Sequence, residues 1–223
     1  MISDYAVKNL FDLEKSIAGA EIGSFTYPWE VLPKIGEIIK NIGSTLSDDY
    51  ETRGENVWIH KSAKVAPSAL ITGPCIICAD AEIRHCAFIR GNALVGAGAV
   101  VGNSTELKNV ILFDKVQVPH YNYVGDSVLG YKSHMGAGSI TSNVKSDKTL
   151  VVIKDRESGE KLETGLKKMG AVLGDNVEVG CGSVLNPGTV VGSNSRIYPL
   201  SSVRGCVKAG SIYKNGNEIV EIK

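Results

Sequence analysis

The chain of 223 residues is long enough for one sizeable core, and 43% of its residues are hydrophobic. Its 24 basic and 24 acidic side chains balance, which argues against nucleic-acid binding and leaves no basic surface for a membrane. No apolar run reaches the roughly 20 residues that span a bilayer, and the charged N-terminus lacks a signal-peptide core. Five cysteines, an odd number, predict free thiols in a reducing compartment and therefore a cytoplasmic protein.

Residues 1–54 are predicted to form a helical N-terminal segment followed by a polar linker. Apolar residues occur at helical spacing after a Ser/Asp start, at Val7, Leu10, Phe11 and Leu13. A second helix is expected to open at Pro28 and to end near Gly43. Pro33 falls inside this stretch and is expected either to kink the helix or to delay its start. The polar sequence of residues 48–56 then predicts a linker.

A repeat of six residues dominates the rest of the chain. Every sixth residue is aliphatic at Ile59, Val65, Ile71, Ile77, Ile83, Ile89, Val95, Val101 and Leu107. A small or β-branched residue stands two positions before each of them, and the pattern returns between Leu173 and Val203. Neither a helix of period 3.6 nor a strand of period 2 gives this spacing. It is typical of a parallel β-helix, in which the aliphatic residue points inward, and so predicts a mainly β fold.

The coil is expected to span residues 55–207 with one interruption. Residues 144–168 contain two β-prone runs around a Ser-Gly turn, which predicts a loop excursion in the form of a hairpin. Residues 208–223 contain an Asn-Gly turn, which predicts a hairpin at the C-terminus. The apolar run of residues 110–112 predicts a face that is buried between subunits.

Cys75 and Cys78 form a CxxC motif that could belong to a metal site or a redox pair. Cys75 occupies a small-residue position of the repeat, however, so packing accounts for it. A second CxxC is absent from the sequence, and zinc needs four well-spaced ligands. We therefore expect no metal.

The period of six fails within the stretch "PHYNYVGDSVLGYKSHMGAGSITSN", residues 119–143. Counted in sixes, the register passes through Phe113 and Pro119 and then slips, because Val124 and Leu129 are only five residues apart. His120 stands beside this slip. A disturbed outer surface of a solenoid is a place where a substrate could dock.

Several motifs extend over residues 26–205, namely YPWEVL, the hexads, PHYNYVGDSVLG, GAGSITSN and TGLKKMGAVLGDNVEVG. They resemble the acetyltransferase domain of the bifunctional glucosamine-1-phosphate acetyltransferase/N-acetylglucosamine-1-phosphate uridylyltransferase family. They resemble even more the archaeal-type sugar-1-phosphate nucleotidylyltransferases that carry such a domain. The block HxxYxGD…GAG…N is far more specific than the hexads alone. This resemblance implies a left-handed β-helix that assembles as a homotrimer, with active sites between subunits. It also implies acetyl-CoA-dependent N-acetylation of an amino-sugar-1-phosphate, either glucosamine- or galactosamine-1-phosphate.

The resemblance also implies roles for individual residues, with His120 as the catalytic base. The residues expected to bind the sugar phosphate are Arg90, Glu106, Lys108, Tyr123, His134, Asn143 and Lys148. Those expected along the coenzyme are Ala137, Cys181 and Pro199. Two of these positions depart from the family: His134 replaces an asparagine, and Lys148 matches a lysine only approximately. We also expect the excursion at 144–168 to close over the bound sugar phosphate.

The residue types suit this chemistry. N-acetylation needs a base to take a proton as the amine attacks the thioester, and histidine titrates near neutrality. A backbone N–H in a glycine-rich turn can stabilise the oxyanion, and Arg90 and Lys108 can hold a phosphate. The alternative for His120 is a surface histidine on a loop. For Arg90 and Lys108, which follow inward residues and point outward, the alternative is solvated charge.

Three other functions compete with this interpretation. A nucleotidylyltransferase is disfavoured, because residues 1–54 are too short for that domain and lack its LAAGxGTRM-type loop. A carbonic anhydrase of the γ class is disfavoured by the lack of a His-x4-His pair. A non-catalytic trimeric scaffold stays open, and acetyl-CoA turnover would separate it from the enzyme.

Overall fold

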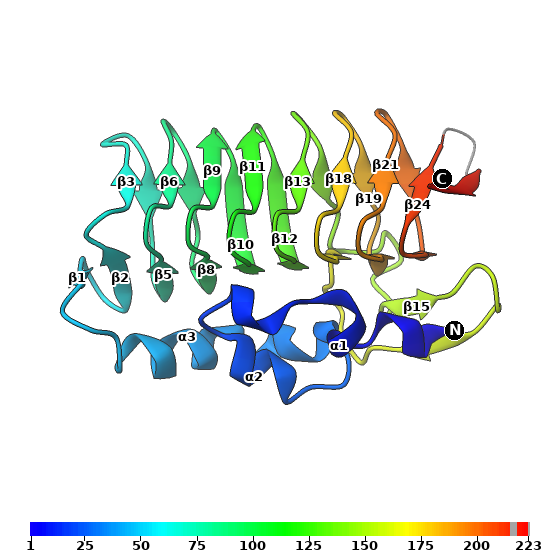
Figure 1. Ribbon diagram of the computed structural model, residues 1–223, viewed down its shortest axis with the longest axis horizontal. Coiled ribbons are helices and arrows are strands. Elements are labelled where there is room, and N and C mark those ends of the chain that lie inside the picture. Colours follow the sequence, from blue (N-terminus) through cyan, green and yellow to red (C-terminus); the bar gives the residue numbers. More distant parts are fainter. Residues whose placement is uncertain (215–217, 223) are drawn as a thin grey trace.

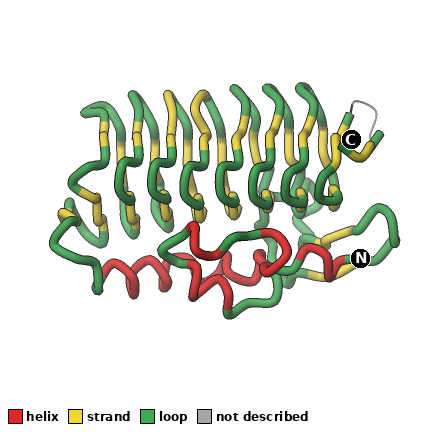
Figure 2. Tube along the Cα trace, viewed as in Figure 1, coloured by secondary structure: helices red, strands yellow, loops and turns green. Residues whose placement is uncertain are grey.

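The computed structural model describes residues 1–214 and 218–222 and shows a left-handed parallel β-helix with a helical layer along one side (Figures 1 and 2). The coil has three faces. The first, which we call the covered face, consists of β2 (Val57–His60), β5 (Cys75–Ile77), β8 (Ala93–Val95), the ends of β10 (Glu106–Leu112) and β12 (Tyr123–Leu129), β17 (Ala171–Leu173), β20 (Thr189–Val191) and β23 (Cys206–Val207).

The second and third faces carry the remaining strands of the coil. The site face consists of β4 (Leu70–Ile71), β7 (Phe88–Ile89), the starts of β10 and β12, β14 (Ile140–Thr141), β19 (Val184–Leu185) and β22 (Ser202–Val203). The polar face consists of β3 (Lys64–Val65), β6 (Glu82–Ile83), β9 (Val100–Asn103), β11 (Gln117–His120), β13 (His134–Met135), β18 (Glu178–Val179), β21 (Arg196–Ile197) and β24 (Ser211–Tyr213).

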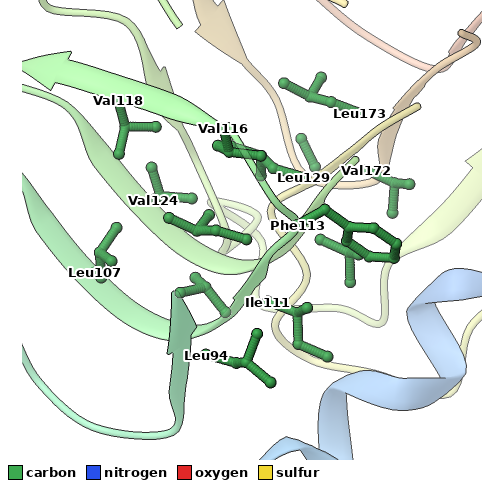
Figure 3. Packing of buried hydrophobic residues seen from close by; sticks show 14 of the residues in the cluster. Leu94, Leu107, Ile111, Phe113, Val116, Val118, Val124, Leu129, Val172 and Leu173 are labelled. Carbon is green, nitrogen blue, oxygen red and sulfur yellow. The ribbon is translucent and has the colours of Figure 1, made fainter. Parts of the chain in front are cut away.

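The aliphatic residues of the repeat form the core, as the sequence predicts. Parallel pairing stacks each one on its equivalent in the next coil, for example Leu107 on Val124. Figure 3 shows these two side chains inside the coil together with Val118 and Leu129. Val65 and Ile71 are only half-buried, because they lie in the first coil, where no coil stacks beneath them.

The period of six breaks at the corner between the site face and the covered face. The inward residues there are Leu107 and Leu112 in one coil and Val124 and Leu129 in the next, each pair five residues apart. The expectation that the register runs through Phe113 and Pro119 is therefore wrong. Phe113 is a buried corner residue that stacks on Phe11 of the helical layer at 4.9 Å between ring centroids. The shortened corners make β10 and β12 continuous seven-residue strands.

The N-terminal segment forms the helical layer over the covered face. Its elements are the 3-10 helices η1 (Ile2–Tyr5), η2 (Leu13–Lys15) and η3 (Pro28–Lys34) and the α-helices α1 (Val7–Leu10), α2 (Gly19–Gly23) and α3 (Ile35–Gly43). Pro33 lies in η3, and α3 begins only after it. Of the two expectations for Pro33, a kink or a delayed start, the delayed start is confirmed. The first predicted helix is instead broken into short pieces.

The breaks in the helical layer have a physical reason. The Leu10 carbonyl accepts from Asp175 N at 3.0 Å and from Ser193 Oγ at 2.9 Å. The Lys15 carbonyl accepts from Asp114 N at 2.9 Å. A continuous helix would use these carbonyls internally, so the layer exchanges helical hydrogen bonds for bonds to the coil.

The helical layer buries an apolar row on the outside of the covered face. The row consists of Ile76, Leu94, Ile111, Val128, Val172 and Val190, all fully buried. Figure 3 shows Ile111 and Phe113 on the side of the coil that faces the helices. The expectation that residues 110–112 lie between subunits is therefore wrong, because Ile111 is covered within its own chain and Val110 and Leu112 are buried with it.

The polar linker and both hairpins also take definite shape. Within residues 48–56, β1 (Tyr50–Thr52) pairs antiparallel with β2, so this stretch is more than a linker. The excursion contains the predicted hairpin, β15 (Val152–Lys154) paired with β16 (Lys161–Glu163). At the C-terminus β24 pairs antiparallel with β25 (Ile219–Glu221), while the Asn-Gly turn between them lies outside the described residues. Every helix in the described part of the chain is too short or too polar to cross a membrane.

Candidate functional site

His120 lies on the corner between the polar face and the site face, which we call the histidine corner. Hydrogen bonds link this corner from coil to coil. Gly138 N donates to His120 O at 3.0 Å, Gly182 N to Ala137 O at 2.9 Å, and Leu200 N to Cys181 O at 2.9 Å. The predicted base and the three predicted coenzyme residues therefore occupy one exposed ridge, in the order His120, Ala137, Cys181 and Pro199.

The backbone around His120 is held from two sides. Asn122 is buried, and its Oδ1 accepts from His120 N at 3.1 Å. Its Nδ2 donates to the carbonyls of Gly136 at 2.9 Å and Ser139 at 3.0 Å in the next coil. In the preceding coil Gly102 approaches so closely that a Cβ there would lie 1.5 Å from the Pro119 carbonyl oxygen. The histidine corner is thus a fixed platform, while the side chain of His120 is exposed.

A second group, the Asp126 cluster, extends across the site face from Glu106 and Tyr123 to Asp126 at the opposite edge. It consists of Arg90, Glu106, Lys108, Tyr123, Asp126 and Asn143. Asp126 is 4% exposed, and its carboxylate accepts from Lys108 Nζ at 2.9 Å and from Asn143 Nδ2 at 2.6 Å. Asn143 Nδ2 also donates to the Tyr123 hydroxyl at 3.2 Å. The cluster brings together five of the seven residues predicted to bind the sugar phosphate.

Charge and burial shift the pKa of two groups in this cluster, Arg90 and Tyr123. Arg90 Nη1 pairs with Glu106 Oε1 at 2.7 Å, and this hydrogen bond raises the pKa of Arg90. Burial raises the pKa of Tyr123, and the charges of Asp126 and Glu106 raise it further. Tyr123 is therefore a neutral hydrogen-bonding group, and Arg90 and Lys108 are cations that two carboxylates already balance.

Asp126 is the residue of this site to which the sequence analysis assigned no role. It is the aspartate of the HxxYxGD block, and it adopts a left-handed backbone with φ of 48° at a shortened corner. Asn109 occupies the equivalent position one coil earlier, with φ of 55°, and also donates to the Asp126 carboxylate, at 3.0 Å. The five-residue step in the repeat was the available signal, and it marks this corner rather than His120.

The other two predicted substrate residues lie apart from the cluster. His134 points out from the polar face, where its Nδ1 is 2.8 Å from Glu178 Oε2. Lys148 is exposed in the excursion, and among the described residues its side chain has no ion pair. The hairpin of the excursion packs beside the later coils, against Gly188 and Gly205, rather than over Asn143. One chain thus does not assemble these two residues with the rest.

Cysteines and acidic groups offer no metal centre in the part of the chain that the structure describes. Cys75 and Cys78 are buried, and burial raises the pKa of the Cys78 thiol to about 12. Because a thiolate is the form that binds metals or attacks disulfides, this pair suits packing rather than chemistry.

Together these features define a hexapeptide-repeat β-helix protein with the histidine corner at one edge of the site face and the Asp126 cluster across that face. The chain belongs to the family described as the GMPPB C-terminal domain, which matches residues 71–193.

Curated relatives extend the similarity along the whole chain. The "Bifunctional protein GlmU" of Methanococcus vannielii is 34% identical over 224 residues, covering 97% of this chain and 53% of that protein. The "Bifunctional sugar-1-phosphate nucleotidylyltransferase/acetyltransferase" of Sulfurisphaera tokodaii is 29% identical, covering 78% of this chain and 43% of that protein. The chain spans about half the length of the curated relatives it matches.

Among solved structures, a hexapeptide transferase family protein from Anaplasma phagocytophilum is 18% identical, with a TM-score of 0.43, covering 75% of this chain and 79% of that chain. The PerB protein of Caulobacter crescentus, solved with CoA and GDP-perosamine, is 18% identical, with a TM-score of 0.27, covering 74% of this chain and 56% of that chain.

Proposed function

We propose that the chain transfers an acetyl group from acetyl-CoA to the amino group of an amino-sugar-1-phosphate, with His120 as the general base. The observation that carries this proposal is that the Asp126 cluster lies on the face that begins at the histidine corner. The histidine corner suits a thioester and the Asp126 cluster a polar, anionic sugar. The acetyltransferase named in the relative from Sulfurisphaera tokodaii supports the same reaction class.

In this reaction the neutral amine attacks the thioester carbonyl, and His120 takes the proton that the nitrogen loses. The C–S bond then breaks, and the leaving thiolate of coenzyme A takes a proton back. The oxyanion formed in between needs a hydrogen-bond donor. The N–H of exposed Ala137 has no hydrogen-bond partner within the described residues, so we assign it this role.

The sugar phosphate would be held by the Asp126 cluster. Arg90 can grip a phosphate with two N–H groups, Lys108 adds a point charge, and the Tyr123 hydroxyl and Asn143 amide offer further hydrogen bonds. Glu106 would meet the amino group or orient Arg90, with which it forms an ion pair. Because both cations already have carboxylate partners, a phosphate must compete for them, and a second subunit is the expected source of additional cations.

The proposal is tested by release of free thiol from acetyl-CoA with different acceptors. We expect turnover with glucosamine-1-phosphate or galactosamine-1-phosphate, and much less with the same sugars lacking phosphate, because the Asp126 cluster then has no anion to bind. N-acetylglucosamine-1-phosphate, whose amine is blocked, serves as the control. Thiol release independent of any amino sugar, or its absence with all acceptors, would reject the acetyltransferase assignment.

We also propose that the chain is a homotrimer. Two large side chains at the histidine corner are exposed, Tyr121 by 65% and Leu200 by 81%, and such residues are typical of surfaces that a partner covers. Light scattering should give about three times the chain mass of 23.7 kDa. Replacing both residues with serine should shift the mass toward that of the monomer. A wild-type chain that scatters as a monomer at micromolar concentration would contradict the shared site.

A further inference from the structure

A groove of about 510 Å³ lies between the excursion and the last coils. We call it the hairpin groove, and its lining residues include Ser142, Lys145, Ser146, Lys154, Asn186 and Arg204. None of the roles assigned above uses Ser146, Lys154 or Arg204.

Close packing fixes the hairpin on the coil. A Cβ on Gly205 would lie 2.7 Å from the Lys154 carbonyl oxygen, and one on Gly188 would lie 2.7 Å from Val151 Cγ1. Arg156 Nε donates to the Arg204 carbonyl at 2.7 Å. Val151 and the neighbouring Ile153 are fully buried. The hairpin is therefore seated on glycine corners of the coil, and the groove beside it is preformed.

The hairpin groove is lined by three cations, Lys145, Lys154 and Arg204, and by one carboxylate, Asp147, in a chain whose net charge is zero. Lys145 pairs with Asp147 at 3.4 Å. Lys154 and Arg204 are exposed, and neither forms an ion pair with another described residue. Ser142 and Ser146, which carry hydroxyl groups, are residues of the same lining. Two uncompensated cations beside two hydroxyls offer the donors that a phosphate accepts.

The groove also continues from the Asp126 cluster along one corner of the coil. Ser142 precedes Asn143 in the chain, and its N–H donates to Leu185 O at 2.8 Å in the next coil. Asn186 follows Leu185, and its N–H donates to Val203 O at 2.9 Å in the coil after that, beside Arg204. A ligand that reaches beyond the cluster would therefore enter the groove.

We propose that the hairpin groove binds a phosphate or diphosphate ester group, with Lys154 and Arg204 as its cations and the serine hydroxyls as further donors. Such a group could come from the nucleotide part of a nucleotide-linked sugar or from coenzyme A. This site is additional to the acetyl-transfer site of the proposed function, and its anion binding does not depend on turnover.

Calorimetric titration of the full chain with pyrophosphate, UDP-N-acetylglucosamine and coenzyme A tests this proposal. The variant Lys154→Ala/Arg204→Ala should weaken binding of pyrophosphate and of one of the two larger ligands by about tenfold or more, since it removes both charge-assisted hydrogen bonds. The matched control is Lys161→Ala/Arg196→Ala. Lys161 of β16 lies opposite Lys154 of β15 in the strand register of the hairpin, and Arg196 is exposed on the polar face. Neither residue lines the groove.

Weakened binding of UDP-N-acetylglucosamine would assign the groove to a nucleotide-linked sugar, and weakened binding of coenzyme A would assign it to the coenzyme. Unchanged affinities for all three ligands in a variant with wild-type melting temperature would overturn the proposal. Equal losses in the control variant would overturn it as well, because they would indicate general charge effects. A chain that binds pyrophosphate in the groove yet lacks acetyl transfer would keep this site and reject the proposed function.

Discussion

Replacing His120 with alanine is expected to lower kcat by ~10²–10⁴-fold, the usual contribution of a positioned general base. The melting temperature should change little, because the His120 side chain is exposed and Asn122 holds only its backbone. Binding of acetyl-CoA should also persist, since its proposed contacts lie in later coils. The loss should shrink as the pH rises, because more of the substrate amine is then already neutral. Steady-state thiol release between pH 6.5 and 9 measures both effects.

His85→Ala is the matched control for this experiment. His85 is exposed on the same corner two coils earlier, where its Nδ1 is 2.6 Å from Ser68 Oγ, and we assign it no role. This variant should turn over like the wild type. If His120→Ala also turned over near the wild-type rate at pH 7, another group would have to be the base.

Replacing Asp126 with asparagine is expected to raise KM for the amino-sugar phosphate by about tenfold to a hundredfold while leaving KM for acetyl-CoA unchanged. The carboxylate accepts from three donors, namely Lys108 Nζ and the side-chain amides of Asn109 and Asn143. An asparagine amide has one oxygen and must turn its NH2 group toward one of these donors, which breaks an arrangement of charge-assisted hydrogen bonds. Lys108 and Asn143 then lose the geometry in which they meet the sugar.

The control for Asp126 is Asp80→Asn. Asp80 adopts the same left-handed backbone, with φ of 56°, but it is exposed and lies away from the cluster. A purely structural role of Asp126 predicts a lower melting temperature with both KM values unchanged or both raised together. That result would contradict a positioning role at the sugar site.

The coil was predictable from the sequence because each aliphatic residue stacks on its own equivalent, so a single period describes the core. The covered face also has a signal in the sequence, which recurs once in every three of the six-residue repeats. The residue between the small and the inward positions is apolar on this face, as in Ile76 and Leu94, but mostly polar on the polar face, as in Glu82. The apolar row on the outside of the covered face does not appear when only the inward positions are counted. The apolar run around Ile111 then resembles a contact between subunits.

The site residues that the resemblance supplied were predictable from the sequence. Contacts that depend on how successive coils stack were not. The resemblance implied Lys108 and Asn143 for the sugar site. It did not include Asp126, which binds both side chains and is brought to them by the stacking of the coils. Coils in this region are 17 residues long, and Asp126 stands 18 residues after Lys108 and 17 before Asn143. The histidine corner and the shortened corner at Asp126 lie close together in the sequence. From the sequence alone, the break in the repeat was therefore assigned to His120 rather than to Asp126.

The helical layer runs against the direction in which the coil grows. Helix α3 packs on β5, β8 and β10, whereas Asp12 N bonds Asp175 at 2.7 Å and Leu10 bonds Ser193, 183 residues away (Figure 1). During synthesis each new coil can stack at once on the one before it. The residues around Leu10, although made early, must wait for the coils of β17–β20 to leave the ribosome. Their docking is therefore the late step of folding, and a chain stalled before residue 193 would display an uncovered apolar strip to chaperones.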